Sequence, residues 1–488
     1  MFLELDGDGP LHQQVYRALR AEILAARLAP GSRLPSTRVL ATSLGLSRNT
    51  VLLAYDQLFG EGYARSRAGA KPVVTSGLAT NGVIEKSGLP SSRKPGAATP
   101  SLSSAGQRML AISRERLLRW DLPTARLPYD FRIGPAFGAF PHAMWCRLLG
   151  RRARRATMRD LDYGPRQGRE ELRAAIADRL LRHRGIVTSP ARIVIVNGTQ
   201  QALDLICRVL LDRGHRVLIE EPHYLGARSA FVAAGARLIA APVDEQGMRV
   251  PPARGYAQAP RIAYVTPSHQ YPTGVVMPLA RRLELLDWAT RCNAFIVEDD
   301  YDSEYRYEGR PIQALAGLDR ASRVIYVGTF SKLMFPALRL GYLALPESLV
   351  EPIAAAKAIT DTGTGTILQL ALADFIEQGP FERHMHRTTK RNRILRVALL
   401  DAIAQHFGDR AEISGANSGL HVLAWIRGRN GRPIRSLTKK ARQVGVGIYP
   451  VAPYYLTAPQ RTGVLLGYGS LGESEIREGI SRLASVLS

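Results

Sequence analysis

From about residue 129 to the C-terminus, short runs of β-branched and aliphatic residues alternate with segments of helical periodicity. The runs are RIVIVNG, RVLIEEP, RIAYVTP, FIVEDDY, RVIYVGT and LGYLALP, and each leads into polar residues or glycine. Such nearly continuous apolar runs, separated by helices, predict an α/β fold with a mostly parallel sheet covered on both faces. Ligands of these sheets bind beyond the carboxyl ends of the strands, so the polar residues there form the candidate site.

The chain of 488 residues is long for one hydrophobic core, and its composition divides it into three regions. Residues 1–75 carry closely spaced helix and turn signals. Residues 76–128 are rich in Ser, Pro, Gly and Ala and lack the apolar density to pack, which predicts a linker. A helical pattern inside it, AGQRMLAISRERLLRW, fits either a docking helix or the first element of the large domain at 129–488.

The formal net charge of +24 favours a polyanionic partner, because basic side chains that face phosphates release condensed counterions. Residues 1–75 carry nine Lys and Arg against six acids, so most of the surplus lies in the rest of the chain. That surplus fits either contact with DNA or an ordinary solvated basic surface.

Cysteine usage and the N-terminus indicate the compartment. Cys146, Cys207 and Cys292 are widely spaced and lie in or beside apolar runs, which favours buried reduced thiols over a disulfide framework or a zinc site. No metal site is expected. The acidic start MFLELDGDGP does not resemble a secretion signal, and no uncharged apolar stretch approaches the length of a membrane span. We therefore expect a cytoplasmic protein without a membrane partner.

Two short helices joined by a glycine turn are predicted in the N-terminal region. Ser36 can cap the first helix, Gly45 permits the turn, and Ser47 can cap the second helix. This is the helix-turn-helix arrangement, whose second helix enters the DNA major groove by its N-terminal end; a helical hairpin for protein contacts is the alternative. Side-chain types suited to base edges and phosphates stand at that end: Ser47, Arg48, Asn49 and Thr50.

The stretch PGSRLPSTRVLATSLGLSRNTVLLAYDQLFGEGY resembles the GntR-type winged helix-turn-helix in the order of its motifs. The resemblance implies binding of double-stranded promoter DNA. The wing tip reads RAGAKP instead of the glycine-rich sequence usual in that family. The DNA contacts implied by the resemblance are Arg38, Arg48, Asn49 and Thr50, with Gly69 and Lys71 in the wing.

Several strand ends of the large domain carry side chains that one cofactor needs together. Asp299 follows one apolar run and Lys332 follows the next, while Gly198 and Thr199 begin a helix whose free N–H groups suit a phosphate. Pyridoxal phosphate requires a lysine, an acid for its ring nitrogen and a phosphate site. Taken alone, the acids at Glu298 to Asp300 would be structural. Thr329, Ser331 and Arg339 could close on the phosphate, and Tyr224 fits either a ring-stacking residue or a core tyrosine.

The motifs NGTQQAL, PTG, EDDYDSEY and GTFSK occur in the order of the fold-type I aminotransferases, which residues 129–488 resemble over nearly their whole length. The resemblance implies that Lys332 binds pyridoxal phosphate covalently, that Asp299 pairs the ring nitrogen and that Tyr301 contacts the ring hydroxyl. It implies a homodimer, because Tyr163 matches a tyrosine that reaches the phosphate from the partner subunit. The phosphate contacts implied are Gly198, Thr199, Gln200, Thr329, Ser331 and Arg339.

Two positions depart from the aminotransferase pattern. Tyr271 stands where those enzymes carry asparagine before PTG, and the segment from Leu465 to Tyr468 lacks the arginine that grips the substrate carboxylate. Arg461 or Arg228 could replace that arginine. The departures put transamination in doubt.

A winged helix, a linker and an aminotransferase-like domain in this order resemble the MocR/GabR-type regulators. This resemblance implies a DNA-binding transcriptional regulator whose large domain senses pyridoxal phosphate or an amine or amino-acid effector. The alternative is an active pyridoxal-phosphate-dependent aminotransferase that also carries a DNA-binding domain. Residual aminotransferase activity is compatible with both hypotheses.

Overall fold

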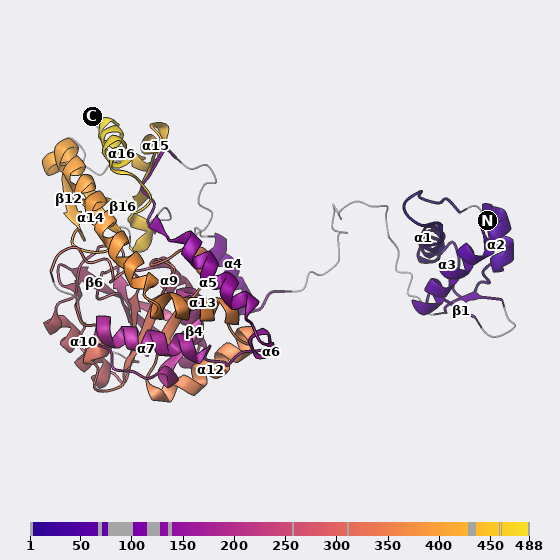
Figure 1. Ribbon diagram of the computed structural model, residues 1–488, viewed down its shortest axis with the longest axis horizontal. Coiled ribbons are helices and arrows are strands. Elements are labelled where there is room, and N and C mark those ends of the chain that lie inside the picture. Colours follow the sequence, from indigo (N-terminus) through magenta and orange to yellow (C-terminus); the bar gives the residue numbers. More distant parts are fainter. Residues whose placement is uncertain are drawn as a thin grey trace. The chain divides into compact units, whose positions relative to one another are not determined.

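The computed structural model describes residues 3–66, 71–76, 101–114, 127–134, 139–255, 258–309, 312–427, 436–457, 459 and 461–486. The chain divides into two compact units, Met1–Ser101 and Leu102–Ser488 (Figure 1). Most of the predicted linker at 76–128, and Gly69 of the predicted wing, lie outside the described residues. In the described part of the chain, no helix has both the length and the apolar character needed to cross a membrane.

The N-terminal unit packs three helices against a two-stranded antiparallel sheet. The side chains of Val15, Leu19, Val51, Tyr55 and Leu58 fill its core. These residues recur at helical spacing, so each helix turns one apolar face inward. The elements are α1 (Leu11–Leu24), α2 (Thr37–Leu44), α3 (Arg48–Gly60), β1 (Ala64–Arg65) and β2 (Val73–Val74).

The two helices of the predicted helix-turn-helix begin where the sequence predicts. The Ser36 hydroxyl accepts a hydrogen bond from the Val39 N–H at 3.3 Å, and the Ser47 hydroxyl accepts one from the Thr50 N–H at 3.1 Å. Gly45 ends α2 in the left-handed region at φ 66°, where a residue without a side chain is favoured. Local chemistry therefore determines both helix starts and the turn.

An eight-stranded sheet forms the centre of the large unit, in the order β4-β11-β10-β9-β8-β5-β6-β7. Neighbouring strands are parallel from β10 through β9, β8 and β5 to β6. The strand β11 is antiparallel to β10 and β4, and β7 is antiparallel to β6. The run LGYLALP is therefore the exception to the parallel pattern. The strands are β4 (Ile193–Val196), β5 (Arg216–Glu221), β6 (Arg237–Asp244), β7 (Gly247–Met248), β8 (Ile262–Val265), β9 (Phe295–Asp300), β10 (Val324–Thr329) and β11 (Gly341–Ala344).

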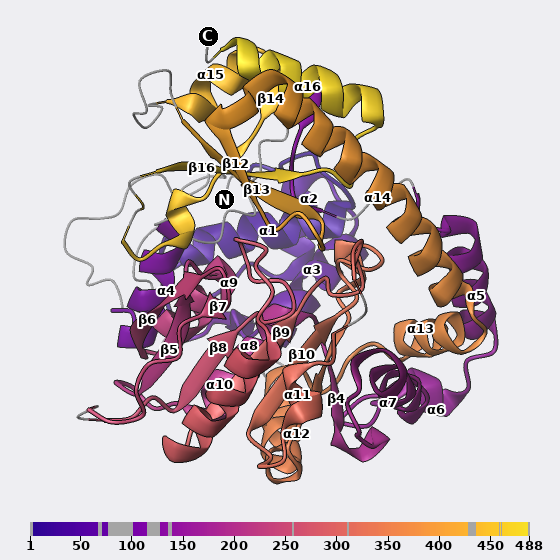
Figure 2. The same cartoon turned by 90° about the vertical axis from the view of Figure 1, so that its left-hand side faces the viewer.

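Helices cover both faces of this sheet (Figure 2). On one face, α8 (Thr199–Leu210), α9 (Leu225–Ala233) and α12 (Glu347–Asp361) pack on the apolar side chains of β4, β5 and β10. On the other face, α10 (Leu279–Arg291) and α11 (Leu315–Leu318) bury a second apolar cluster. Burial on both faces explains why the strands read as continuous apolar runs.

A second, four-stranded antiparallel sheet lies near the C-terminus, in the order β12-β13-β16-β15. The long helix α14 (Pro380–Phe407) runs from beside the large sheet toward it (Figure 2). A short strand pair, β3 (Tyr129–Asp130) with β14 (Val446–Gly447), joins the start of this unit to its end. The other elements are α5 (His142–Arg154), α6 (Met158–Leu161), α7 (Glu170–Arg184), α13 (Thr366–Glu377), β12 (Ala411–Ser414), β13 (His421–Ile426), α15 (Leu437–Gln443), β15 (Tyr449–Pro450), β16 (Thr462–Gly467) and α16 (Glu473–Ser485).

The helical pattern within the predicted linker forms α4 (Ser104–Arg114), which belongs to the large unit. It packs on α9, and the Arg108 guanidinium donates a hydrogen bond to the Ala233 carbonyl at 3.2 Å. The structure therefore places a docking helix at the start of the large unit. One cysteine prediction is wrong: Cys207 and Cys292 are buried free thiols, but Cys146 is exposed because it lies on the outer face of α5.

Candidate functional site

The predicted DNA contacts of the N-terminal unit lie on its surface. Ser47, Arg48 and Asn49 are exposed in the first turn of α3 or at its cap, and Arg38 is exposed in the first turn of α2. Among the described residues, the side chains of Arg38 and Asn49 make no hydrogen bond or ion pair. Thr50 is half-buried and its hydroxyl lies 2.8 Å from that of Ser47, so it helps to hold the cap. Lys71 is exposed just before β2.

The predicted cofactor residues of the large unit gather at one edge of the eight-stranded sheet. Asp299 and Val327 are paired across the parallel strands β9 and β10, so Lys332 follows the end of the strand next to Asp299. Thr329 pairs with Gly341 on β11, and Gly341 in turn pairs with Val196 at the end of β4. The helix α8, which starts just after Gly198, therefore begins at the same edge.

Asp299 is buried and only half satisfied. Its Oδ2 accepts a hydrogen bond from the Tyr264 hydroxyl at 2.6 Å, whereas its Oδ1 has no partner in the described part of the protein. Burial raises the pKa of Asp299 to about 7, the Tyr264 hydrogen bond lowers it, and the charges of Asp300 and Asp302 add to the increase. A buried carboxylate oxygen without a partner fits a cationic N–H group of a ligand.

Tyr301 belongs to a hydrogen-bonded group with His269 and Asp302. The Tyr301 hydroxyl lies 2.9 Å from Nδ1 of His269, and the Asp302 carboxylate lies 3.0 Å from the same nitrogen. A proton on Nδ1 lets His269 donate to both partners, so the Tyr301 hydroxyl keeps its own proton for another acceptor. His421 packs against His269, and burial, followed by the proximity of His269, lowers the pKa of His421 to about 3. The ligand atoms of His269, Asp302 and His421 lie within 4.8 Å of one another. Nδ1 of His269 is bonded to Asp302, whereas Nε2 of His269 and Nδ1 of His421 are buried without a hydrogen-bond partner among the described residues.

Lys332 is half-buried beside this group. Burial lowers the pKa of its ammonium, while the charge of Asp302 opposes that shift. A lowered pKa increases the neutral fraction of an amine, which is the nucleophilic form. The Tyr305 hydroxyl donates to the Lys332 carbonyl at 3.1 Å and so holds the backbone at this position.

The residues predicted to bind phosphate surround the N-terminus of α8. The N–H groups of Thr199 and Gln200 open that helix and have no carbonyl acceptor within it. Gly198 adopts φ 90°, a conformation that favours glycine, and a Cβ there would lie 3.0 Å from the Arg339 guanidinium and would crowd it. Arg339 donates to the Asn197 carbonyl at 2.8 Å.

Two polar atoms at this edge are buried without a hydrogen-bond partner among the described residues: Oγ of Ser331 and Oε1 of Gln200. Thr329 Oγ1 accepts the Ser331 N–H at 3.2 Å. Together with Asp299 Oδ1, these atoms leave a set of donors and acceptors that the protein itself does not satisfy. That pattern is typical of a site built for a polar ligand.

Tyr224 and Tyr271 meet edge to face, with ring centroids 5.7 Å apart. Tyr224 is the N-cap residue of α9, and a Cβ on Gly226 would lie 2.5 Å from its ring, so the glycine makes room for the ring. Tyr271 also contacts Tyr301, and its hydroxyl donates to that of Tyr454 at 3.3 Å. The residue that replaces the aminotransferase asparagine therefore fills the space between the other tyrosines.

Three predicted residues lie apart from this cluster or are engaged elsewhere. Tyr163 is 84% exposed, on the segment that follows α6, and makes no side-chain contact with the cluster in the described chain. Arg461 forms an ion pair with Glu412 and stacks over Trp425 at 4.7 Å. Arg228 lies in the first turn of α9 and forms no hydrogen bond or ion pair through its side chain among the described residues.

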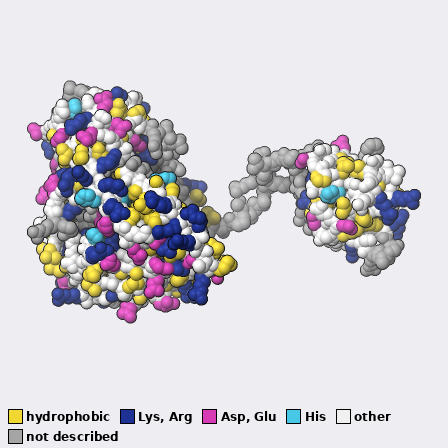
Figure 3. All heavy atoms as spheres, in the orientation of Figure 1, with side chains coloured by type: hydrophobic (Ala, Val, Ile, Leu, Met, Phe, Trp, Pro, Cys, Tyr) yellow, Lys and Arg dark blue, Asp and Glu magenta, His cyan; other side chains and the backbone are white. Residues whose placement is uncertain are grey.

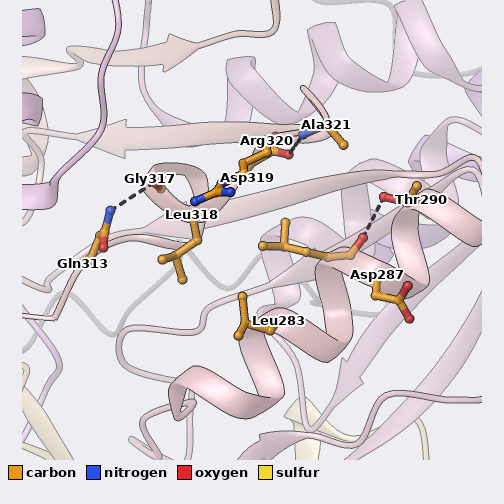
Figure 4. A pocket seen from close by; sticks show the side chains of 10 residues that line it. Leu283, Asp287, Thr290, Gln313, Gly317, Leu318, Asp319, Arg320 and Ala321 are labelled. Carbon is orange, nitrogen blue, oxygen red and sulfur yellow. Dashed lines mark hydrogen bonds between the residues drawn. The ribbon is translucent and has the colours of Figure 1, made fainter.

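A separate hollow lies between α10 and the segment that follows α11 (Figure 4). Asp319 accepts the Ala321 N–H at 2.9 Å, Gln313 donates to the Gly317 carbonyl at 3.0 Å, and Thr290 donates to the Leu286 carbonyl at 3.0 Å. These polar groups are satisfied within the protein. None of the residues predicted to bind cofactor or DNA lines this hollow.

Sequence reasoning missed the partners of the predicted residues. Tyr264, which holds Asp299, reads as an ordinary strand tyrosine. His269 and Asp302 were visible in the motifs TPSHQYPTG and EDDYDSEY, but their contact with Tyr301 depends on the pairing of strands 30 residues apart or more. His421 comes from the second sheet, and no local signal connects it to this site.

Two family models match the chain. Residues 11–71 match bacterial regulatory proteins of the gntR family, and residues 147–461 match aminotransferase class I and II. The chain is 38% identical to the probable rhizopine catabolism regulatory protein MocR of Rhizobium meliloti, over 99% of this chain and 95% of that protein. It is 29% identical to the pyridoxine biosynthesis transcriptional regulator PdxR of Corynebacterium glutamicum, over 97% of this chain and 95% of that protein.

The large unit is also similar to solved aminotransferases. The α-aminoadipate aminotransferase LysN of Thermus thermophilus, solved with N-(5'-phosphopyridoxyl)-L-leucine, is 28% identical with a TM-score of 0.69. The match covers 79% of this chain and 97% of that one. It confirms the predicted aminotransferase-like fold, which implies dependence on pyridoxal phosphate, and the gntR match implies DNA binding.

The end-to-end relatives decide between the two functional hypotheses. MocR and PdxR align with both the helix-turn-helix and the aminotransferase-like part, whereas LysN aligns with the second part alone. Because the relatives that match over the whole chain are named as regulators, the regulator hypothesis is favoured over an active aminotransferase that also carries a DNA-binding domain. This chain belongs to the MocR/PdxR-type transcriptional regulators, in which a GntR helix-turn-helix domain precedes an aminotransferase class I and II domain.

Proposed function

We propose that this regulator binds pyridoxal phosphate at the sheet edge around Lys332 and that occupancy of this site changes its binding to promoter DNA. The observation that carries the proposal is the unpaired, buried Oδ1 of Asp299, on the strand that pairs with β10, the strand that Lys332 follows. Burying a carboxylate without a partner costs free energy, so a ligand with a cationic N–H group would relieve that cost.

The residues at the site fit pyridoxal phosphate. Lys332 would attach it covalently, Asp299 would accept from its ring nitrogen and the Tyr301 hydroxyl would donate to its ring oxygen. When bound, the cofactor supplies an electron-withdrawing ring that stabilises negative charge on the carbon next to an attached amino nitrogen. Tyr224 would cover one face of the ring, and the residues proposed for the phosphate are Gly198, Thr199, Gln200, Thr329, Ser331 and Arg339.

The residues around the site also orient one another. Tyr264 holds Asp299 by its Oδ2 so that Oδ1 is available, and Asp302 holds His269 against Tyr301. Because both tyrosines and both acids are largely buried, water competes weakly for these hydrogen bonds. The site would be ordered before the cofactor arrives.

We propose that the working form is a homodimer. Tyr163 is 84% exposed, and Met158 and Leu161 nearby are 82% and 67% exposed. Exposed apolar side chains in one short segment indicate a protein contact. A dimer would cover this segment and would let Tyr163 of the partner subunit complete the phosphate site.

The effector that we propose is an amine or an amino acid, which would react with the bound cofactor through its amino group. Transamination would be slow, because the segment from Leu465 to Tyr468 lacks the arginine that grips a substrate carboxylate, and Arg461 is held by Glu412 and Trp425. Arg228 has no partner among the described residues and remains the candidate for holding a carboxylate. An active aminotransferase is the second candidate function.

The cofactor proposal is tested by absorbance of the full-length protein after incubation with pyridoxal phosphate. The wild type should acquire a visible band of lysine-bound cofactor that resists dialysis, and Lys332→Ala should lose it. Lys440→Ala, which removes an exposed lysine from α15, is the matched control and should keep the band. A band that persists in Lys332→Ala would show that another amine holds the cofactor.

The DNA proposal is tested with the full-length protein and its own upstream DNA. Arg48→Ala with Asn49→Ala should lower affinity for that DNA at least about tenfold relative to a duplex of random sequence, because base contacts carry the preference. The midpoint of thermal unfolding should not change, since both side chains are exposed. Unchanged preference in the variant would contradict the assignment of α3 as the reading helix.

A further inference from the structure

The positive charge of this protein is concentrated away from its helix-turn-helix. Residues 1–75 carry a surplus of three basic residues, out of a formal net charge of +24. A domain that reads DNA therefore accounts for little of the charge. The large unit carries most of the excess, and its described part shows where that charge gathers.

Two helices that lie beside each other on the large unit are strongly basic. The helix α5 contains four arginines and no acid, and α14 contains six Arg and Lys and no acid between Arg383 and Arg396. A hollow lined by His142, Arg147, Arg383 and Arg387 joins the two helices. Figure 3 shows Lys and Arg side chains gathered on this face, over α14 and α5.

Some of these basic groups have structural partners. Arg151 and Arg152 form ion pairs with Asp374, and Arg391 donates to the carbonyls of Gly469 and Leu471. Others are exposed and form no ion pair or hydrogen bond through their side chains among the described residues. We name this second set the α5–α14 basic surface: Arg147, Arg383, Arg387, Lys390 and Arg393.

The contrast with other surface helices argues against an ordinary solvated surface. On several other surface helices, exposed arginines pair with an acid one turn away, as Arg182 does with Asp178, Arg208 with Asp204 and Arg482 with Glu478. Such pairs reduce repulsion between like charges. The short helix α15 differs, because its exposed Lys440 and Arg442 form no ion pair among the described residues. On the α5–α14 basic surface, no acid lies one helical turn from these groups. Their mutual repulsion is therefore not reduced within the helix, and an anionic partner would reduce it.

The spacing along α14 fits a linear polyanion. Arg383, Arg387 and Lys390 follow one another at intervals of four and three residues, so they lie in one row about 10 Å long. Duplex DNA carries one negative charge per about 1.7 Å of its axis. The row can therefore face several phosphates at once, and Arg147 extends it across the hollow to α5.

We propose that the α5–α14 basic surface binds the phosphate backbone of duplex DNA without reading its sequence. Guanidinium and ammonium groups contact phosphates of any sequence and give affinity and salt dependence, not base preference. The large unit would then add affinity for DNA, while α3 selects the site. This inference rests on the proposed DNA binding and assigns a second DNA surface to the unit that holds the cofactor site.

The test compares two variants of the full-length protein with the same change in charge. The first replaces Arg147, Arg383, Arg387 and Lys390 by serine. The matched control replaces exposed basic residues that also lack ion pairs but lie elsewhere on the large unit: Arg213, Arg237, Arg254 and Arg320. Fluorescence anisotropy with a labelled 50-base-pair duplex of random sequence, titrated from about 50 to 300 mM KCl, gives the slope of log affinity against log salt.

The surface variant should bind this duplex at least about tenfold more weakly at 100 mM KCl. Its salt slope should fall by about 3.6, because each of the four lost phosphate contacts lowers the slope by about 0.9. The control should change the slope by less than about 1. Equal losses in the two variants would mean that net charge alone acts, and an unchanged slope in the surface variant would mean that this surface is solvated; either result overturns the proposal.

Two further measurements keep the outcomes separate. In the surface variant, the midpoint of thermal unfolding and the visible band of bound cofactor should match those of the wild type. If the surface variant does not fold, the double variant Arg387→Gln with Lys390→Gln is measured in its place. The expected change in its salt slope is about 2. The preference for upstream over random DNA should survive in the surface variant and be lost in Arg48→Ala with Asn49→Ala. Loss of preference in the surface variant would contradict a sequence-independent role.

Discussion

The two units of this protein hold their functional residues in opposite ways. In the N-terminal unit Arg38, Arg48 and Asn49 are exposed and have few or no partners. In the large unit Asp299 is buried and Tyr301 half-buried, and hydrogen bonds already join them to neighbouring residues. The difference follows from the ligand. Duplex DNA binds to the protein surface, so the residues that contact it are exposed to solvent. A small cofactor is enclosed by its site, and the buried polar groups of that site need hydrogen-bond partners even when the cofactor is not bound.

The comparison predicts that removing a buried polar group of the large unit costs several kcal/mol of stability, whereas removing an exposed one costs about 1 kcal/mol or less. The clearest case is the ion pair between Arg184 of α7 and Asp300 at the end of β9, with Nη2 and Oδ2 2.8 Å apart and both side chains buried. The Tyr326 hydroxyl donates to the same carboxylate at 2.6 Å. Desolvation lowers the pKa of Arg184, but the Asp300 charge outweighs it, and the net pKa is raised.

The largest effect is therefore expected for Asp300→Asn, which leaves the Arg184 charge buried and unpaired. The free energy of unfolding should fall by about 3–5 kcal/mol in urea denaturation of the full chain. The double variant Arg184→Met with Asp300→Asn should lose less than the sum of the single losses, since it leaves no buried charge. Asp204→Asn breaks an exposed pair with Arg208 and should cost less than about 1 kcal/mol. If Asp300→Asn and Asp204→Asn lowered the free energy of unfolding by similar amounts, the contrast between buried and exposed groups would be wrong.

The next prediction concerns the pH dependence of Asp299 in the cofactor-free protein. Its pKa is raised to about 7 from an ordinary value of 3.8, mainly by burial. The folded state therefore keeps this proton at pH values where the unfolded state has lost it, and the contribution to stability falls as the pH rises from about 4 to 7. A carboxylate that must ionise without a partner destabilises the fold.

Asp299→Asn removes this titration. Relative to the wild type, the variant should gain stability as the pH rises from 5 to 8, by about 2–3 kcal/mol in the free energy of unfolding, because about two pH units of this titration lie above pH 5. Urea denaturation at several pH values measures the difference. The variant should also lose pyridoxal phosphate, because an amide cannot hold the ring nitrogen charged. A stability difference that is independent of pH would show that Asp299 is already ionised below pH 5.

The smallest effect is expected for an exposed residue of the N-terminal unit that contributes to the free energy of unfolding. Ser47 is exposed, yet its hydroxyl caps α3 through the Thr50 N–H. Ser47→Ala should lower the stability of that unit by about 1 kcal/mol and weaken DNA binding. Ser43→Ala is the matched control, because its hydroxyl donates to the Leu40 carbonyl inside α2, where the loss is expected to be near zero. Equal unfolding midpoints for the two variants would mean that the cap is dispensable.

Much of the fold and of the candidate site was predictable, because the signals are local. The caps Ser36 and Ser47 and the turn at Gly45 act on neighbouring residues, so their motif is readable in one stretch of sequence. The strand ends were predictable for the same reason, since a buried parallel strand is apolar and the residues that follow it are polar. The antiparallel direction of β11 was not predictable, because strand direction depends on how the chain returns to the sheet.

By itself, the sequence determined the order of the modules, the helix starts of the reading motif and the identity of the residues at the strand ends. Only the tertiary structure decided which of them meet. Tyr264 holds Asp299 across 35 positions of sequence, and His421 reaches His269 from the second sheet. The same is true of Arg147 and Arg383, which share one surface although they lie on α5 and α14. Propensity and capping act within a few residues, whereas hydrogen bonds in a site and charge on a surface depend on distances that only packing sets.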